Sequence, residues 1–106
     1  MTASKLDSAG LDLLVMIKER VITIIRWSGI KLPKLEEMTG ISRYTWNNLK
    51  NPAKSREIKE EEIEAICGIY PQFALWVVSG KIAPECGQTS PEYEEANSNL
   101  NKPQAG

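Results

Sequence analysis

The chain has 106 residues, of which 42% are hydrophobic and 25% are charged, and its formal net charge is −1. This length and balance fit a single soluble domain with one small core. The sequence contains no histidine, and its two cysteines, Cys67 and Cys86, do not form a Cys-x-x-Cys pair. Histidine-based catalysis is therefore excluded, and a structural zinc site would lack ligands.

Two features of the N-terminal third argue against a membrane or secreted protein. The most apolar stretch, Leu11 to Trp27, is interrupted by five charged residues, so inserting it into a bilayer would have a high free-energy cost. Residues 1–10 lack a basic start followed by an apolar run, which a secretion signal would need. We therefore expect a cytoplasmic protein with no membrane partner.

Charge is distributed unevenly along the chain. The segment from Lys18 to Lys59 holds ten basic and four acidic residues, a net charge of +6, whereas the remainder holds three basic and ten acidic residues, a net charge of −7. A basic middle between acidic ends is typical of a protein that binds a polyanion. The alternative is that these lysines and arginines only solvate helix faces.

We expect residues 1–10 to form a flexible N-terminus. The first predicted helix follows it and ends near Trp27. Leu14, Ile17, Val21 and Ile25 recur at helical spacing and mark one buried face. The β-branched residues from Val21 to Ile25 favour a strand by local propensity, but length and period favour a helix.

The next two predicted helices are short and joined by a tight turn. Pro33 fits the first turn of a helix spanning residues 34–39, and Gly40 closes that helix in a left-handed conformation. Ser42 is a good N-cap for a helix spanning residues 43–50, which must end before Asn51-Pro52.

Two further helices are predicted at residues 57–67 and 72–79, ending at Gly68 and Gly80. Residues 82–106 form a C-terminal extension, which we expect to be partly disordered, with one short helix from Pro91 to about Ala96. No strand is predicted. The acidic run Glu60–Glu62 could pair carboxylates for acid–base or metal chemistry, but its alternation with isoleucines favours a solvated helix face.

The helix at residues 43–50 carries the most informative pattern. At about 100° per residue, Trp46 and Leu49 share one side of this helix. The opposite side collects polar residues suited to base edges: Arg43, Tyr44, Asn47, Asn48 and Asn51. Arginine pairs bidentately with guanine, and asparagine pairs with adenine. The alternative is a solvated polar helix, although lysine and glutamate would be the stronger helix formers there.

The segment resembles the helix-turn-helix of the Cro/cI-type (Xre-like, lambda-repressor-like) DNA-binding family. The resemblance covers roughly residues 11–80 and is carried by Leu35-x4-Gly40-Ile41-Ser42-Arg43-x2-Trp46-x2-Leu49. The stretch from Ile69 to Lys81 is similar to that family's closing helix, especially in phage cI-like repressors. The resemblance implies an all-α, lambda-repressor-like five-helix bundle over residues 11–81, whose third helix enters the major groove, usually as a homodimer on a palindromic site.

The same resemblance implies which residues contact DNA. It places base contacts on Arg43, Tyr44, Asn47 and Asn48, and backbone contacts near Thr39, Ser42 and Lys50. By charge, the loop residues Lys54 and Arg56 are further candidates for phosphate contacts, with ordinary solvation as the alternative. Two features depart from the family: Glu36 replaces a small alanine, and the loop of residues 51–59 is longer and more basic and lacks the usual Glu-Asn-Gly turn.

These observations favour a sequence-specific regulator of transcription that binds double-stranded DNA. A protein-interaction module, such as an antitoxin or antirepressor, is the alternative, in which the acidic segment from Glu85 to Glu95 would hold a protein partner. An enzyme is not expected, because the chain has no phosphate loop, metal cluster or nucleophile–base pair, and no cofactor is expected.

We also expect a homodimer. The first and fifth predicted helices carry more apolar surface than a single packing stripe requires, and large exposed apolar patches usually mark a contact. The alternative is that residues 82–96 fold back and cover this surface within one chain.

Overall fold

The computed structural model describes residues 2–101, with side chains for residues 13–98. This part of the chain forms six α-helices and two short 3₁₀ helices. The elements are α1 (Thr2–Ser28), α2 (Leu32–Thr39), α3 (Arg43–Lys50), α4 (Glu60–Ile69), η1 (Pro71–Phe73), α5 (Ala74–Ser79), η2 (Pro84–Cys86) and α6 (Pro91–Asn101). Over this range the one β pairing is an isolated bridge between Ala83 and Gln88. The fold is therefore all-α, as the sequence predicts.

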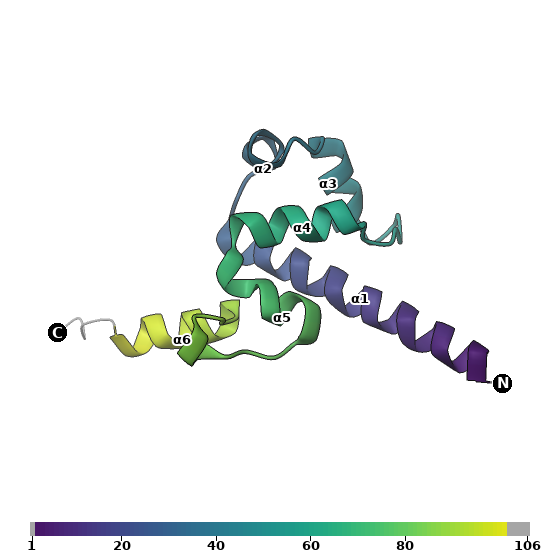
Figure 1. Ribbon diagram of the computed structural model, residues 1–106. Helices are drawn as coiled ribbons and strands as arrows, with labels where there is room; N and C mark the ends of the chain where they lie inside the picture. Colours follow the sequence, from purple (N-terminus) through teal and green to yellow (C-terminus); the bar gives the residue numbers. More distant parts are fainter. Residues whose placement is uncertain (1, 102–106) are drawn as a thin grey trace.

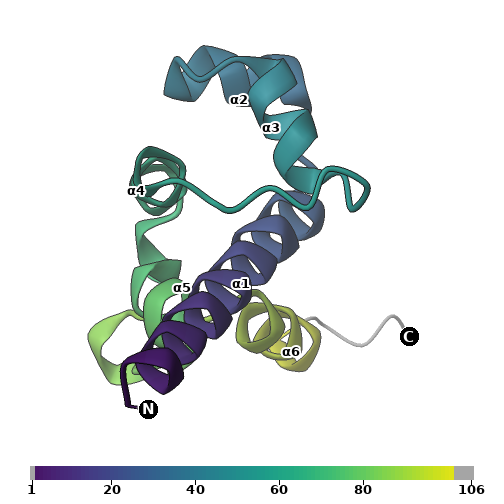
Figure 2. The ribbon, with the colours of Figure 1, turned by 90° about the vertical axis from the view of Figure 1, so that its right-hand side faces the viewer.

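Helix α1 is the longest element, and α4, α5 and α6 all pack against it. Helices α2 and α3 pack on each other and lie on the opposite side of the molecule from α6 in both views (Figures 1 and 2). The N-terminal part of α1 extends beyond the other helices (Figure 1). No helix in the described range is both long and apolar enough to span a membrane.

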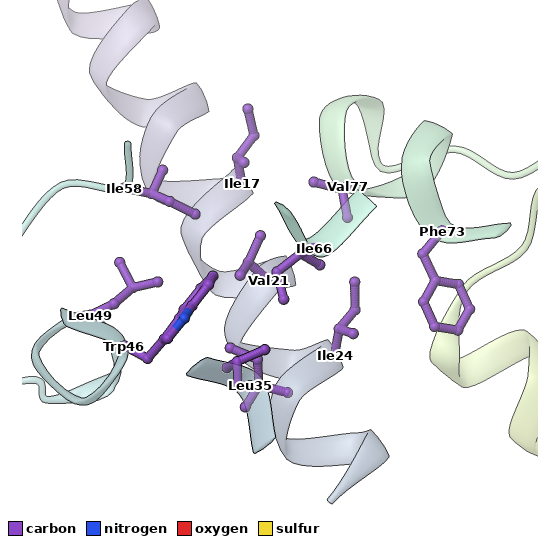
Figure 3. Close-up of a cluster of buried hydrophobic side chains, with 11 residues drawn as sticks. Ile17, Val21, Ile24, Leu35, Trp46, Leu49, Ile58, Ile66, Phe73 and Val77 are labelled. Carbon is purple, nitrogen blue, oxygen red and sulfur yellow. The ribbon is translucent and has the colours of Figure 1, made fainter. Parts of the chain in front are cut away.

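The hydrophobic core is built around one stripe of α1. Ile24 and Ile25 lie three and four residues after Val21, which itself follows Ile17 by four, and all four side chains are buried. Side chains from the other helices and from the loop before α4 complete the core (Figure 3): Leu35, Trp46, Leu49, Ile58, Ile66, Phe73 and Val77. Burial of the β-branched residues on this stripe therefore outweighs their local preference for a strand.

The boundaries of α4 differ from the prediction. The helix begins at Glu60 instead of Glu57, because the preceding residues are not helical and Ile58 enters the core from there. The carboxylate of Glu62 then accepts the backbone N–H of Lys59 at 2.8 Å, which caps the first turn. At the other end α4 continues through Gly68 to Ile69, so this glycine is not the stop.

Both ends of the chain contain more helix than predicted. Residues 2–10, expected to form a flexible N-terminus, continue α1 as an extension of an already formed helix. The C-terminal extension folds back: the N–H of Thr89 donates to the carbonyl of Gln72 at 2.8 Å, and α6 packs on α1 and runs to Asn101. The expectation of disorder over residues 102–106 lies outside the described range.

A buried ion pair joins the loop before α4 to that helix. Glu62 is completely buried, and its carboxylate accepts from both terminal nitrogens of Arg56, at 2.6 and 3.1 Å. The same guanidinium donates to the carbonyls of Thr45 in α3, at 3.0 Å, and Glu57, at 2.9 Å. The acidic run therefore presents Glu60 and Glu61 to solvent, as predicted, but turns Glu62 inward.

We predict that Arg56→Ala lowers the free energy of unfolding by about 3 kcal/mol, because it leaves the buried carboxylate of Glu62 without its cation. Urea denaturation would measure the loss. Lys54→Ala, a cation removed from an exposed position in the same loop, is the matched control and should change stability by less than about 0.5 kcal/mol. Equal stability of the two variants would contradict a structural role for Arg56.

Candidate nucleic-acid interface

The turn between α2 and α3 has the backbone that a tight helix-turn-helix requires. Gly40 follows α2 with φ +75° and ψ 0°, a left-handed conformation that glycine adopts at little cost, and its N–H donates to the carbonyl of Glu36 at 2.8 Å. Two residues later, Ser42 caps α3, because its hydroxyl oxygen accepts the N–H of Tyr44 at 3.1 Å. The predicted bounds of α3 are confirmed.

The hydroxyl of Thr39 fixes α3 against α2. It donates to the carbonyl of Leu35 at 2.7 Å and accepts the backbone N–H of Ile41 at 3.1 Å and the indole N–H of Trp46 at 3.2 Å. Trp46 is completely buried, so this bond satisfies the only polar atom of its side chain. With one proton donated and both lone pairs occupied, this hydroxyl holds the turn together and has no capacity left for the backbone contact predicted for Thr39.

The two sides of α3 have the contrast that its sequence predicts. Trp46 and Leu49 are both completely buried. On the opposite side Arg43, Tyr44 and Asn47 are exposed, with Tyr44 at 75%, and Asn48 is half-buried. The four residues expected to contact bases therefore share one accessible face, on a helix whose other face is locked in the core.

Arg43 is held in place by a carboxylate from α2. Oε1 of Glu36 accepts a hydrogen bond from Nε of Arg43 at 2.8 Å and forms an ion pair with Nη2 at 2.8 Å, and Oε2 accepts the backbone N–H of Arg43 at 3.3 Å. The side-chain hydrogen bond from Arg43, followed by the bond from its backbone, lowers the pKa of Glu36 below its ordinary value. Glu36, identified in the sequence only as a departure from the family, is thus part of the same face.

The cations predicted to contact phosphate are divided between two roles. Lys50 ends α3 and is half-buried, and Lys54 is exposed in the loop that follows. The N–H of Lys54 donates to the carbonyl of Asn51 at 3.0 Å, which shapes the loop just beyond α3. Arg56, by contrast, is bonded to Glu62 and two carbonyls inside the fold, so the structure does not support a phosphate contact for it.

Sequence reasoning missed the pairing of Glu36 with Arg43 and that of Arg56 with Glu62. Each pair joins two elements, so the period of a single helix carries no sign of it. A partial signal existed for Glu62, because a carboxylate at the third residue of a helix commonly turns back to cap it, but nothing marked Arg56 as its partner. No comparable signal marked Glu36, since its contact with Arg43 depends on the angle at which Gly40 sets the two helices.

We predict that Thr39→Val lowers the free energy of unfolding by about 1–3 kcal/mol, because the indole N–H of Trp46 would then be buried without an acceptor. Thr39→Ser keeps the hydroxyl and loses one methyl group, so it should cost about 1 kcal/mol or less. Chemical denaturation of both variants measures the difference. If valine were tolerated as well as serine, the hydroxyl would not be what fixes the turn.

Comparison with known proteins identifies a relative among solved structures. No protein-family model and no curated protein matches the chain. The fold is similar to that of Pf6r from the filamentous phage Pf6 of Pseudomonas aeruginosa PA01, with a TM-score of 0.71 and 34% sequence identity over 81% of this chain and 98% of that one. At this identity and coverage, the chain belongs to the same family as the phage protein Pf6r.

Proposed function

We propose that the protein is a sequence-specific, double-stranded DNA-binding regulator of transcription of the Cro/repressor type, with α3 as the helix that enters the major groove. The observation that carries this proposal is the accessible face of α3, where Arg43, Tyr44, Asn47 and Asn48 stand on a helix anchored by Trp46. Arginine and asparagine are the side chains best suited to read guanine and adenine in that groove. Kinship with a phage protein is consistent with a regulatory role.

The surroundings of α3 support the same proposal. Ser42 lies at its N-terminal end and Lys50 and Lys54 at its C-terminal end, so groups suited to phosphate flank the base-reading residues. The described part of the C-terminal extension, which ends at Asn101, lies on the other side of the molecule and does not cover this face (Figures 1 and 2). A duplex can therefore approach α3 without rearrangement of the fold.

A protein-interaction module is less well supported. That alternative needs the acidic segment from Glu85 to Glu95 to hold a partner, but this segment makes bonds to its own fold. The side-chain carbonyl of Gln88 accepts the N–H of Leu75 at 2.9 Å, and Glu94 accepts from the hydroxyl of Thr89 at 2.7 Å. These contacts are typical of a folded part of the domain and not of a free segment that binds a partner.

We further propose that the protein is a homodimer that uses the exposed apolar side chains of α1 just before its buried stripe. Leu13, Val15 and Met16 remain 46–53% exposed although the C-terminal extension has folded back. The extension instead lies near the C-terminal end of α1, where Pro91 and Trp27 line a shared pocket. The alternative, in which residues 82–96 cover the apolar surface within one chain, therefore leaves this part of α1 unaccounted for.

Substitutions on the two sets of DNA-contacting residues should have different effects. We predict that Arg43→Ala and Asn47→Ala each lose about 1–3 kcal/mol of binding free energy on the preferred duplex and make the protein less selective for its sequence. Lys54→Ala should weaken binding to all duplexes alike. It should also make the plot of log affinity against log salt concentration shallower by about one unit of slope. Titration of labelled preferred and random duplexes at several salt concentrations distinguishes the two effects.

Lys81→Ala serves as the control for that titration, because Lys81 is an exposed cation beyond α5. It should leave both the affinity and the salt slope unchanged. If Arg43→Ala, Asn47→Ala and Lys54→Ala behaved identically on preferred and random duplexes, α3 would not be the reading helix. A pull-down that captured a protein partner while no duplex bound would favour the interaction module.

The dimer is tested by placing a charge on its proposed interface. We predict that the full chain has the mass of a dimer in light scattering at micromolar concentration and that Met16→Lys converts it to a monomer. Met38→Lys is a matched control, because Met38 in α2 is 50% exposed and Met16 is 46% exposed. It should leave the dimer intact. A monomeric wild-type chain would contradict a dimer in the absence of DNA.

A further inference from the structure

The hydrogen bonds of Arg43 leave one edge of its guanidinium available. A guanidinium has five N–H donors, in two forks that can each engage a pair of acceptors. Nε and Nη2 form the fork that faces Glu36, with both nitrogens 2.8 Å from Oε1. Among the described residues no protein acceptor engages Nη1, so the fork made by Nη1 and the second N–H of Nη2 is open.

From this geometry we infer that Glu36 is a positioning residue for base recognition, which holds Arg43 so that its open fork is ready to pair with O6 and N7 of one guanine. This inference rests on the proposed function, because it names how one residue of that interface achieves specificity. A guanidinium already fixed by a carboxylate loses less rotamer freedom on binding, and its direction favours a base with two acceptors on one edge.

The bond from the backbone N–H of Arg43 to Glu36 adds to this positioning of Arg43. Oε2 accepts the N–H of Arg43, which is the first residue of α3 and needs a partner outside the helix. The two oxygens of one carboxylate therefore hold both the start of α3 and the side chain of its first residue. A movement of the guanidinium away from Glu36 would break a bonded arrangement instead of a loose surface contact.

Glu36 also places a negative charge on the face that would meet DNA. Its side chain is 34% exposed and that of Arg43 is 47% exposed, so both are within reach of the solvent from which a duplex approaches. A carboxylate repels phosphates on every sequence, whereas its orienting effect acts only where Arg43 finds its guanine. The repulsion lowers affinity for all duplexes alike, whereas the orienting effect raises the ratio of specific to non-specific affinity.

The inference is tested by measuring affinity for the preferred duplex, for all its single-base-pair substitutions and for a random duplex. Wild type and Arg43→Ala identify the guanine that Arg43 reads. Glu36→Gln, which is nearly isosteric, should lower discrimination at that base pair by about three- to tenfold and raise affinity for the random duplex. In the Arg43→Ala background, Glu36→Gln should leave discrimination unchanged.

Glu37→Gln is the matched control, because Glu37 is the neighbouring carboxylate and pairs with Lys34 at 3.1 Å on an exposed surface. It should raise affinity for all duplexes equally and leave their ratios as in wild type. Arg43→Lys supplies a second variant: it keeps the charge facing Glu36 but lacks the fork, so it should lose discrimination at the same base pair. Thermal unfolding of each variant confirms that it is folded.

The outcomes separate the inference from the function on which it rests. A wild-type protein without preference among duplexes would overturn the proposed function itself. A specific wild-type protein whose discrimination is lost in Arg43→Ala but retained in Glu36→Gln would overturn only the positioning role. Equal weakening of all duplexes by Glu36→Gln would also overturn it, because that result indicates a purely structural contribution to α3.

Discussion

Burial of the apolar stripe on α1 is the constraint on which the rest of the molecule depends. Ile17, Val21, Ile24 and Ile25 form the part of the core that two groups of helices cover. Helices α2 and α3 cover it with Leu35, Trp46 and Leu49, and the α4–α5 segment covers it with Ile66, Phe73 and Val77 (Figure 3). Because both groups share one core, the outward face of α3 is fixed relative to the whole chain, although α3 has only eight residues.

Half of the cations in the middle of the chain already have an acceptor within the protein, either in the interior or on the surface. At least five of the ten cations between residues 18 and 59 bond to protein acceptors: Lys18, Arg20, Lys34, Arg43 and Arg56. Arg20, for example, donates to the carbonyl of Val77 near the C-terminal end of α5, where a cation also interacts favourably with the helix dipole. The formal charge of this segment therefore overstates the number of cations that have no protein partner. Both the composition and the bonds of each cation decide how many can neutralise phosphates.

The sequence predicted most of what depends on local spacing and little of what depends on contacts between elements. The bounds of α3 followed from Ser42 and Asn51-Pro52, and its buried and exposed sides followed from helical periodicity. The start of α4 was displaced because Ile58 satisfies the core from an extended segment, which a periodic pattern cannot distinguish from a helix. Glu36 and Arg56 acquired their roles through partners six or seven residues away across a turn, so the angle between elements had to be known first.

The bond between Thr39 and Trp46 has a consequence for the dynamics of the reading helix. The indole N–H is fully enclosed and its acceptor belongs to α2, so this proton can exchange with solvent deuterium only when α3 separates from α2 or the domain unfolds. Its exchange rate thus reports local opening of the helix pair, and exchange of backbone amides near Val21 reports opening of the core. A single resonance of one tryptophan therefore gives access to the rigidity with which the chain presents α3.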